Sequence, residues 1–421
     1  MVTTITPQYE EYLWTFDLTY QDVSSTFNGT PINGPQFSPL SINGYGSSIS
    51  FSSAAQQSVV TSTPFLSLNN RSWTFEAWIY LQTIPNNSNY YGIVGQCQSE
   101  SLDICFHLII YEEKLYFGFF ADDISGQTSL LASKWYHVAF VFDNVSRSQS
   151  IYLNGILDGN RTADSVYLGS SGDLTFGTCL PGSGACFFDG LIDQLSFIGR
   201  VKTSAEILDG ATLTLHFSFD NGSLYDSGPL RLDGSLFGTT SVVTGRVGDA
   251  LQFGVSLDSY FRVGGLVLLG ISNQSYSMSI WMKPNVIDNS TIIHVSSRSN
   301  GSGWCLEMLG LRSSGQLIAR SYSGTLVSVT GPILSANSWT HVAMTYNRLN
   351  GLRLYVNGTL YNSSIPFAYY GSGSPNYLFL GSSLNMTFCS GASGQYVGIL
   401  DEFRVYSREL TAYDVYTLSH S

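Results

Sequence analysis

The sequence has little charge of either sign. Only 11% of its 421 residues are charged, against roughly 25% in an average soluble protein. The 18 Lys and Arg residues are outnumbered by 30 Asp and Glu residues, which leaves a net charge of -12. A surface of that sign repels phosphate backbones, so the composition argues against nucleic acid as a partner.

Long apolar runs are also missing. No window reaches the ~18 uninterrupted apolar residues that a membrane-spanning helix needs, and the longest candidate, residues 261–271, is interrupted by glycine. Residues 1–14 lack the basic start and the apolar centre of a signal peptide. We therefore expect no membrane span, and we expect an export signal only outside this sequence.

Aromatic residues and glycine, in contrast, are abundant. The chain has 26 Tyr, 25 Phe and 7 Trp, enough to bury a large core, together with 42 Gly. Its length exceeds one ordinary core and suits two domains of roughly 200 residues each.

The same short sequence motifs recur in the same order in the two halves of the chain. Residues 73–79, 135–140, 152–155 and 190–195 return as residues 276–282, 339–344, 355–358 and 398–403. A nearly constant offset in residue number between the repeated motifs indicates tandem duplication. We expect an N-terminal segment, residues 1–11, followed by two similar domains at residues 12–210 and 211–421.

Within each copy the apolar pattern has a period of two. Residues 73–77 alternate apolar and polar side chains, as a half-buried strand does. Asn154-Gly155 and Asn357-Gly358 stand between β-prone runs and predict type I′ hairpin turns. The pattern predicts an all-β fold of two tandem antiparallel β-sandwiches, with short helices only at residues 203–208 and 411–416.

The second copy resembles the laminin G-like family of concanavalin A-like β-sandwich domains. The segments that carry the resemblance are residues 215–220, 225–228, 245–253, 276–283, 339–343, 354–358 and 398–406. The first copy looks like a diverged member without a clear counterpart of residues 245–253. The resemblance implies a jelly-roll-like sandwich, usually extracellular, that serves adhesion or glycan recognition and is only sometimes attached to a catalytic domain.

Catalytic motifs are absent from the sequence. Some relatives of this fold are glycoside hydrolases with a Glu-x-Asp-x-x-Glu strand, which this chain lacks. Glu112-Glu113 and Asp122-Asp123 are adjacent pairs that point to opposite faces of a strand, so neither flanks a bond at the ~5–9 Å separation that the reaction requires. We interpret both pairs as solvated turns. No G-x-S-x-G motif is present either, so we expect no catalytic residue and no enzymatic activity.

Six cysteines divide four and two between the copies. Cys305 aligns with Cys105, and Cys389 falls in the loop that corresponds to the one with Cys179 and Cys186. This predicts a Cys305–Cys389 disulfide, with Cys105 bonded to Cys179 or Cys186 and Cys97 to the remaining one. Local Cys97–Cys105 and Cys179–Cys186 bonds are the alternative, because four cysteines permit three connectivities. Disulfides would place the protein in an oxidising compartment; reduced cytosolic thiols are the competing interpretation.

Twelve Asn-x-Ser/Thr sequons are candidate N-glycosylation sites. They are Asn28, Asn70, Asn86, Asn144, Asn160, Asn221, Asn273, Asn289, Asn300, Asn357, Asn362 and Asn385. We predict a secreted glycoprotein whose glycans supply the solubility that charged side chains normally provide. Unmodified sequons are the alternative.

Six aspartates recur in matching positions and are candidate calcium ligands. Asp17, Asp22 and Asp193 correspond to Asp220, Asp226 and Asp401. Ca²⁺ takes 6–8 oxygen ligands, and some members of the resembled family hold such an ion. No D-x-D-x-D-G loop is present, so we favour the interpretation that these carboxylates cap backbone N–H groups. Calcium is the one cofactor that these residues suggest.

Histidines and tyrosines give two further hypotheses. His137 and His341 occupy the same position of the repeat, within apolar sequence motifs, so we expect them to have a shared structural role. The pairs Tyr90-Tyr91 and Tyr369-Tyr370 are candidates for a sugar-stacking platform, with simple packing as the alternative.

The expected function is contact with glycans or extracellular proteins. The first hypothesis is a non-catalytic extracellular adhesion or structural glycoprotein that associates with itself or with neighbouring chains. In it, the Thr-rich residues 2–8 act as an arm that adds to an exposed sheet edge. The second is a lectin-like carbohydrate-binding receptor, and the third is an accessory module of a glycan-active enzyme.

Overall fold

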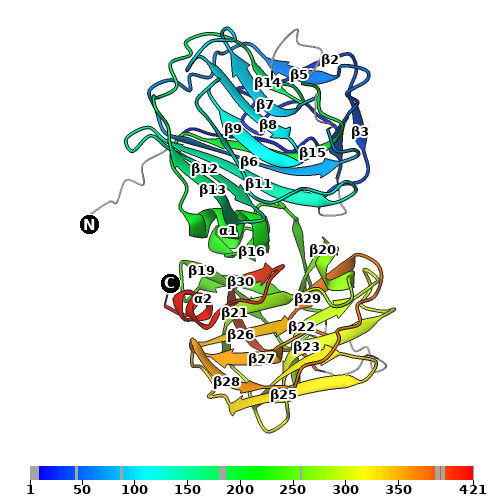
Figure 1. The fold of residues 1–421 in the computed structure, drawn as a ribbon. Coiled ribbons are helices and arrows are strands. Elements are labelled where there is room, and N and C mark those ends of the chain that lie inside the picture. The colour runs from blue at the N-terminus through cyan, green and yellow to red at the C-terminus, as the bar shows by residue number, and fades with distance from the viewer. Residues whose placement is uncertain are drawn as a thin grey trace, which may run out of the picture. The chain divides into compact units, whose positions relative to one another are not determined.

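The computed structural model describes residues 9–42, 46–85, 89–179, 186–256, 258–384, 389 and 394–420. The chain divides into two compact units, Met1–Ala211 (unit 1) and Thr212–Ser421 (unit 2). Each unit consists of one eight-stranded and one seven-stranded antiparallel sheet (Figure 1). The predicted fold class, two tandem antiparallel β-sandwiches, is confirmed.

In unit 1 the eight-stranded sheet has β1 paired to β15 and otherwise runs β13 (Ile156–Thr162), β12 (Ser148–Leu153), β11 (Trp135–Asp143), β6 (Trp73–Leu81), β15 (Gly190–Ile198), β4 (Ser48–Phe51), β3 (Gln36–Ser38). The seven-stranded sheet runs β10 (Asp123–Ser125), β9 (Lys114–Gly118), β8 (Cys105–Tyr111), β7 (Tyr91–Cys97), β14 (Leu174–Phe176), β5 (Ser58–Thr61), β2 (Thr30–Ile32). Strand β1 spans Glu11–Trp14, and its Glu11 pairs with Ile198. Residue 11 therefore belongs to the sandwich, while residues 2–8 of the predicted arm lie outside the described residues.

Unit 2 repeats this strand order. Its eight-stranded sheet has β16 (Leu213–Phe217) paired to β30 and otherwise runs β18 (Thr240–Thr244), β19 (Asp249–Phe253), β30 (Gly398–Tyr406), β21 (Tyr276–Pro284), β26 (Thr340–Asn347), β27 (Gly351–Val356), β28 (Thr359–Ser363). Its seven-stranded sheet runs β17 (Gly234–Phe237), β20 (Tyr260–Leu266), β29 (Asn376–Leu380), β22 (Ser290–Ser296), β23 (Cys305–Leu311), β24 (Gln316–Tyr322), β25 (Leu326–Ile333). Two 3₁₀ turns, η1 (Asp220–Gly222) and η2 (Leu268–Gly270), are inserted between strands.

Each core is buried between the two sheets of its unit. Unit 1 is rich in aromatic contacts: the ring of Trp73 lies 5.0 Å from that of Phe106 and 5.7 Å from that of Phe142. Unit 2 fills the same layer mainly with aliphatic side chains and methionines, such as Met278 and Met308. The alternation of inward apolar and outward residues therefore fixes which face of each strand remains available for a site.

The predicted hairpin turns are present in both units. Asn154 and Gly155 have φ values of 51° and 81°, and Asn357 and Gly358 have 47° and 79°. Positive φ at both central positions is the geometry of a type I′ turn. In each turn the asparagine Oδ1 accepts a 3.0 Å hydrogen bond from the backbone N–H of a histidine, either His137 or His341.

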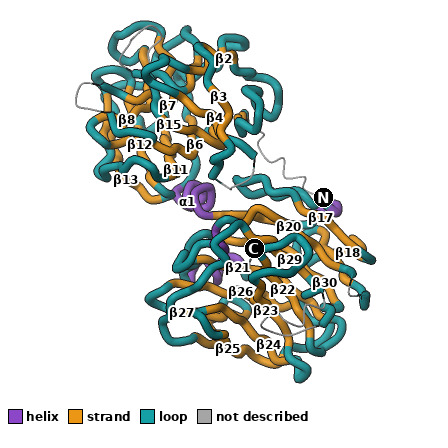
Figure 2. The backbone as a smooth tube through the Cα atoms, turned by 90° about the vertical axis from the view of Figure 1, so that its right-hand side faces the viewer, coloured by secondary structure: helices purple, strands orange, loops and turns teal. Residues whose placement is uncertain are grey.

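Two short helices cover the outer faces of the eight-stranded sheets. They are α1 (Ser204–Thr212) and α2 (Ala412–Leu418), and Figure 2 shows that the rest of the described chain is almost entirely strand and loop. Both helices extend beyond the predicted ends at residues 208 and 416, because residues of the added turns are packed as well: Ala211 is buried in α1, and Leu418 of α2 packs on the cluster that includes Tyr355. Among the described residues, no helix has the length and apolar character needed to cross a membrane.

Candidate functional site

The outer face of the seven-stranded sheet in unit 1 carries the candidate site. Strand periodicity sends alternate side chains of β8 and β9 into the core, namely Phe106, Leu108, Ile110, Leu115 and Phe117. The residues between them therefore face outward and include His107, Ile109, Tyr111 and Tyr116. This second set includes one histidine and two tyrosines, whose rings combine apolar faces with polar atoms.

These outward residues line a cavity of about 550 Å³, which we call the groove. Its described lining residues are Tyr90, Glu100, His107, Ile109, Tyr111, Tyr116, Phe120, Ala121, Asp123 and Cys179. The volume falls in the range of roughly 300–1,000 Å³ that is usual for small-molecule sites.

Aromatic rings form the walls of the groove. Tyr90 stacks on Tyr111 with ring centroids 4.9 Å apart, and Tyr111 meets Tyr116 edge to face at 5.9 Å. His107 stacks on Tyr116 with an interplanar angle of 8°. Tyr90 is 38% exposed and Phe120 is 36% exposed, so both present ring surface to a ligand.

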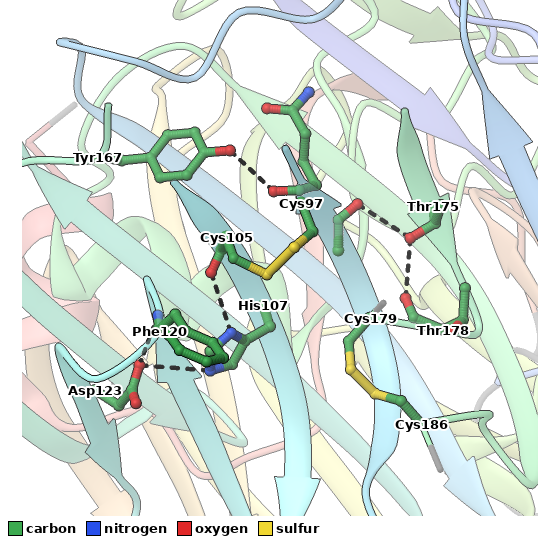
Figure 3. The surroundings of a disulfide bond; sticks show 12 residues. Cys97, Cys105, His107, Phe120, Asp123, Tyr167, Thr175, Thr178, Cys179 and Cys186 are labelled. Atoms are coloured by element: carbon green, nitrogen blue, oxygen red, sulfur yellow. Dashed lines mark hydrogen bonds and ion pairs between the residues drawn. A yellow bond between two sulfur atoms is a disulfide. The ribbon is translucent and has the colours of Figure 1, made fainter. Parts of the chain in front are cut away.

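Asp123 is the polar centre of the groove. Its Oδ1 accepts a 3.2 Å hydrogen bond from the Phe120 N–H and lies 3.4 Å from His107 Nε2 (Figure 3). Its Oδ2 accepts a 3.3 Å hydrogen bond from the Tyr116 hydroxyl. Burial, reinforced by the Asp123 charge, raises the pKa of Tyr116 to about 12. The phenol therefore stays protonated and remains a hydrogen-bond donor.

His107 lies beneath these rings. Its Nδ1 is 3.2 Å from the carbonyl oxygen of Cys105. Burial lowers the pKa of His107, and the nearby Asp123 carboxylate opposes that shift. The imidazole therefore contributes polar atoms to the groove rather than a positive charge at neutral pH.

Two local disulfides lie near the groove, and Cys179 is the one of their cysteines that lines it. Cys97 is bonded to Cys105, and Cys179 is bonded to Cys186 (Figure 3). The favoured pairing of Cys105 with Cys179 or Cys186 is therefore wrong, and the local alternative holds. The reason is register: Cys97 and Cys105 are directly opposite each other in the β7–β8 pair, which places their sulfurs within bonding reach. In unit 2 Cys305 is bonded to Cys389, the pairing that the repeat predicts.

Two glycines let the Cys179 segment lie directly on the sheet. A Cβ at Gly92 or Gly95 would stand 2.4 Å from backbone atoms at Thr178 or Cys179. Only glycine permits this approach. Cys179 is thereby placed at the edge of the groove.

The two acidic pairs have different environments. Glu112 and Glu113 form the exposed β8–β9 turn, as predicted. The prediction of a solvated turn is wrong for Asp122, which is buried, pairs with Arg161 at 2.7 Å and accepts the backbone N–H of Ser165. It is also wrong for Asp123, because the short strand β10 turns that side chain into the groove.

The candidate calcium ligands act as backbone caps. Asp22 accepts from Phe27 N and Asp226 from His216 N, while Asp17 accepts from Ser47 N and Asp220 from Asp249 N. Asp193 Oδ2 accepts from Ile42 N, and Asp401 Oδ2 accepts from Arg246 N and Val247 N. Within the described part of the chain, no three His, Cys, Asp or Glu side chains converge in a way that could hold a metal ion. Capping of backbone N–H groups therefore accounts for the positions of these side chains, and calcium binding stays a hypothesis from the sequence.

His137 and His341 have matching surroundings. Each ring lies 5.2 Å from a tryptophan ring, that of Trp78 or Trp281. Burial lowers the pKa of both imidazoles to about 3. They are buried neutral side chains, which agrees with the shared structural role expected from the repeat.

Of the tyrosines singled out in the sequence, only Tyr90 lines the groove. Tyr91 is buried, and so is Tyr369, whose hydroxyl donates a 2.6 Å hydrogen bond to the carbonyl oxygen of Leu269. The other groove residues were not predicted. Their signal in the sequence is the alternation within residues 105–111 and 114–118. There His107, Tyr111 and Tyr116 stand between apolar residues that face the core.

The sequons lie mostly on the surface. Nine of those in the described residues are exposed: Asn28, Asn70, Asn160, Asn221, Asn273, Asn289, Asn300, Asn357 and Asn362. Asn144 is half-buried. Asn86 and Asn385 lie outside the described residues. Occupancy by glycans stays a prediction.

Comparison with protein families matches the laminin G type of the concanavalin A-like lectin/glucanases superfamily to residues 53–208 and 253–416. Comparison with curated proteins finds no match. Among solved structures, the chain is similar to domain 4 of AbnA, an extracellular arabinanase from Geobacillus stearothermophilus in complex with arabinotriose. The identity is 24% and the TM-score 0.37, over 49% of this chain and 98% of that one.

Two toxin domains are also similar. One is the binding domain of Paraclostridial mosquitocidal protein 1, at 18% identity and a TM-score of 0.39, covering 50% of this chain and 52% of that one. The other is the binding domain of botulinum neurotoxin serotype G, at 17% identity and a TM-score of 0.38, covering 49% and 50%. The alignment thus spans about half the length of each toxin domain. Since the family model matches most of both units, the chain belongs to the concanavalin A-like lectin/glucanase superfamily as two tandem laminin G-like domains.

Proposed function

We propose that the protein is a non-catalytic extracellular glycoprotein that binds oligosaccharides in the groove of unit 1. The observation that carries this proposal is the groove itself, in which Tyr90, Tyr111, Tyr116 and Phe120 surround Asp123. A pyranose ring presents one face of C–H groups that packs on an aromatic ring, while its hydroxyls donate to carboxylates. The groove offers both kinds of contact side by side.

The arrangement favours holding a ligand over transforming it. The Asp123 carboxylate is already shared among Tyr116, His107 and the Phe120 N–H. A general acid or base must exchange a proton with its substrate, whereas this carboxylate is held in place by several donors. It is better suited to orienting hydroxyl groups.

An extracellular location is supported by the covalent chemistry. All six cysteines form disulfides, and disulfides persist in oxidising compartments. Exposed sequons in both units are compatible with N-glycosylation.

The test is glycan binding by the protein made in a secreting eukaryotic host. A glycan array should return hits, and Tyr111→Ala should weaken the best hit by roughly three- to tenfold, since a ring contact contributes about 0.5–1.5 kcal/mol. Tyr413→Ala is the matched control, because Tyr413 is 77% exposed on unit 2 and lies outside both the groove and β28. An array without hits, or a Tyr111 variant that binds like the wild type, would reject the proposal.

A second candidate function, association with other chains, is favoured by the edge strand β28. All five of its residues are exposed and none is charged. Leu360 and Tyr361 are 48% and 54% exposed. An uncharged edge offers backbone N–H and C=O groups to a strand from another molecule.

The matching edge of unit 1 is covered. Gln127 N donates a 3.2 Å hydrogen bond to the carbonyl oxygen of Asp158 in β13. Association is therefore proposed for unit 2, whereas the arm at residues 2–8 remains a prediction from the sequence.

Sedimentation velocity of deglycosylated protein tests this second function. Tyr361→Lys should shift the distribution toward monomer, because a charge on the edge opposes strand pairing. Tyr225→Lys is the control, since Tyr225 is exposed but lies outside the strand. A glycan at Asn362 in β28 should have the same effect as the lysine. Monomers at every concentration for the deglycosylated wild type would reject association through β28.

A further inference from the structure

Resting on the proposed glycan-binding function, we infer that the groove accepts uncharged oligosaccharides and excludes acidic ones, and that Glu100 determines this selectivity. The inference comes from the charges on the groove wall. Glu100 and Asp123 are its two ionisable acids. None of its described lining residues is Lys or Arg. The sequence segments next to Tyr90 and Cys179, residues 86–88 and 180–185, contain no charged residue.

Glu100 carries a charge that its surroundings leave uncompensated. Its side chain is exposed in the turn before β8 and lines the groove. It forms no hydrogen bond or ion pair with any described residue. Asp123 differs, because the Tyr116 hydroxyl and the Phe120 N–H donate to it. Glu100 is therefore the acid that a ligand meets with its full charge.

Two cations lie near the groove without lining it. The Arg161 guanidinium pairs with Asp122 at 2.7 Å and with Asp164 at 3.5 Å, and it donates a 2.8 Å hydrogen bond to the carbonyl oxygen of Asp123. Lys114 pairs with Tyr111 in the β8–β9 register but is not a lining residue. It also follows Glu112 and Glu113 in the turn. His107 adds no positive charge at neutral pH, because burial lowers the pKa of its imidazole.

A carboxylate or sulfate on a bound sugar would thus face two negative side chains without a compensating cation. Two like charges about 5 Å apart repel by about 0.8 kcal/mol even at the dielectric constant of water, and by more in a partly enclosed site. We therefore expect at least roughly fourfold weaker binding for an acidic oligosaccharide than for its uncharged counterpart.

The test compares matched pairs of oligosaccharides at pH 7.5, each pair differing only by a uronic acid or a sulfate group. Titration calorimetry with the glycosylated full chain should show at least roughly fourfold tighter binding of the neutral member. In Glu100→Gln the difference should shrink to about twofold, because the acidic member gains affinity when the charge is removed. Asp173→Asn is the control, because it removes an exposed acid of unit 1 that does not line the groove.

Salt provides a second readout. Raising the ionic strength from 0.05 to 0.5 M should strengthen binding of the acidic member and leave that of the neutral member unchanged, because salt screens repulsion between exposed charges. Acidic members that bind as tightly as neutral ones would overturn the inference and leave the proposed function intact. If neither member of any pair binds, the proposed function itself fails. A selectivity unchanged in Glu100→Gln would overturn the role of that residue.

Discussion

The two units share one fold but differ on the outer face of the seven-stranded sheet. In unit 1 that face is the groove. In unit 2 Glu307 takes the position of His107 and pairs with Arg320 of β24 at 2.9 Å, with both side chains buried. His294 takes the position of Gly95 and is buried beside the Gly301 carbonyl oxygen, 3.1 Å away. The same surface is open in one unit and filled in the other.

The difference shows how a duplicated sandwich separates ligand binding from stability. Glycine at positions 92 and 95 admits a disulfide loop beside β7, and aromatic side chains on the neighbouring strands leave room for a ligand. In unit 2 a histidine and an ion pair occupy the corresponding space. Core-facing positions stay apolar in both units, although many aromatic rings of unit 1 are replaced by aliphatic side chains and methionines in unit 2.

The largest expected effect concerns the disulfides. Cys305–Cys389 closes 84 residues and Cys97–Cys105 closes 8. Loop-closure entropy predicts a loss of about 4.6 kcal/mol for Cys305→Ala with Cys389→Ala, and of about 2.6 kcal/mol for Cys97→Ala with Cys105→Ala. Urea denaturation of the two double variants checks the order. An equal loss in both would mean that chain entropy does not explain their contributions.

The buried ion pair of unit 2 should be the next most sensitive point. Glu307→Gln leaves the Arg320 charge buried without its partner and should lower the unfolding free energy by about 3–5 kcal/mol. The double substitution Glu307→Leu with Arg320→Met should cost less than Glu307→Gln alone. Arg353→Met is the control, because the Arg353–Glu409 pair is more exposed and should contribute no more than about 1 kcal/mol. A double variant as unstable as the sum of both single changes would contradict this account.

Gly95→Ala tests the close packing that shapes the groove. The new Cβ would meet the Cys179 backbone at 2.4 Å, so the segment must move. We expect a loss of about 1–3 kcal/mol together with weaker glycan binding. Gly254→Ala should be nearly neutral, since its closest neighbour is the Thr239 carbonyl oxygen at 3.6 Å. Unchanged stability and binding in Gly95→Ala would show that the Cys179 segment moves without a loss of unfolding free energy.

A smaller difference between the units should appear in their pH dependence. Burial raises the pKa of Asp193 to about 7 and that of Asp401 to about 6, from 3.8. Each folded unit therefore holds a proton that its unfolded chain has lost, so the unfolding free energy falls as the pH rises from about 4 to these values. Asp193→Asn should remove the decrease between pH 6 and 7, while Asp401→Asn should act only below about pH 6. Denaturation curves at half-unit pH steps check both expectations, and an unchanged slope in Asp193→Asn would contradict them.

The smallest expected effect is that of a chelator. Because the candidate calcium ligands already accept backbone N–H groups, 5 mM EDTA should shift the melting temperature of either unit by less than about 1 °C. Differential scanning fluorimetry with and without added CaCl₂ makes the measurement. A stabilisation that depends on calcium concentration would show that a site exists despite these caps.

The repeated sequence motifs and the two-residue period of apolar side chains were sufficient to predict the architecture. Residues 73–79 and 276–282 became β6 and β21, and the Asn-Gly pairs became type I′ turns, because periodicity and turn chemistry are local properties. The matching aspartates were correctly interpreted as caps, but only Asp22 and Asp226 accept from N–H groups close in the sequence. The N–H groups that Asp193 and Asp401 cap lie in distant parts of the chain, so only the tertiary structure identifies them.

The groove and the disulfide pairs of unit 1 were decided by tertiary structure. Glu100, His107, Asp123 and Cys179 are brought together by strand register and by a segment that returns to β7 over two glycines. Each is unremarkable in its own stretch of sequence. The sequence by itself thus determined which residues face the core, since that depends on alternation along one strand. Only the packing of strands decided which outward residues share a cavity, because that depends on pairing between segments far apart in the chain.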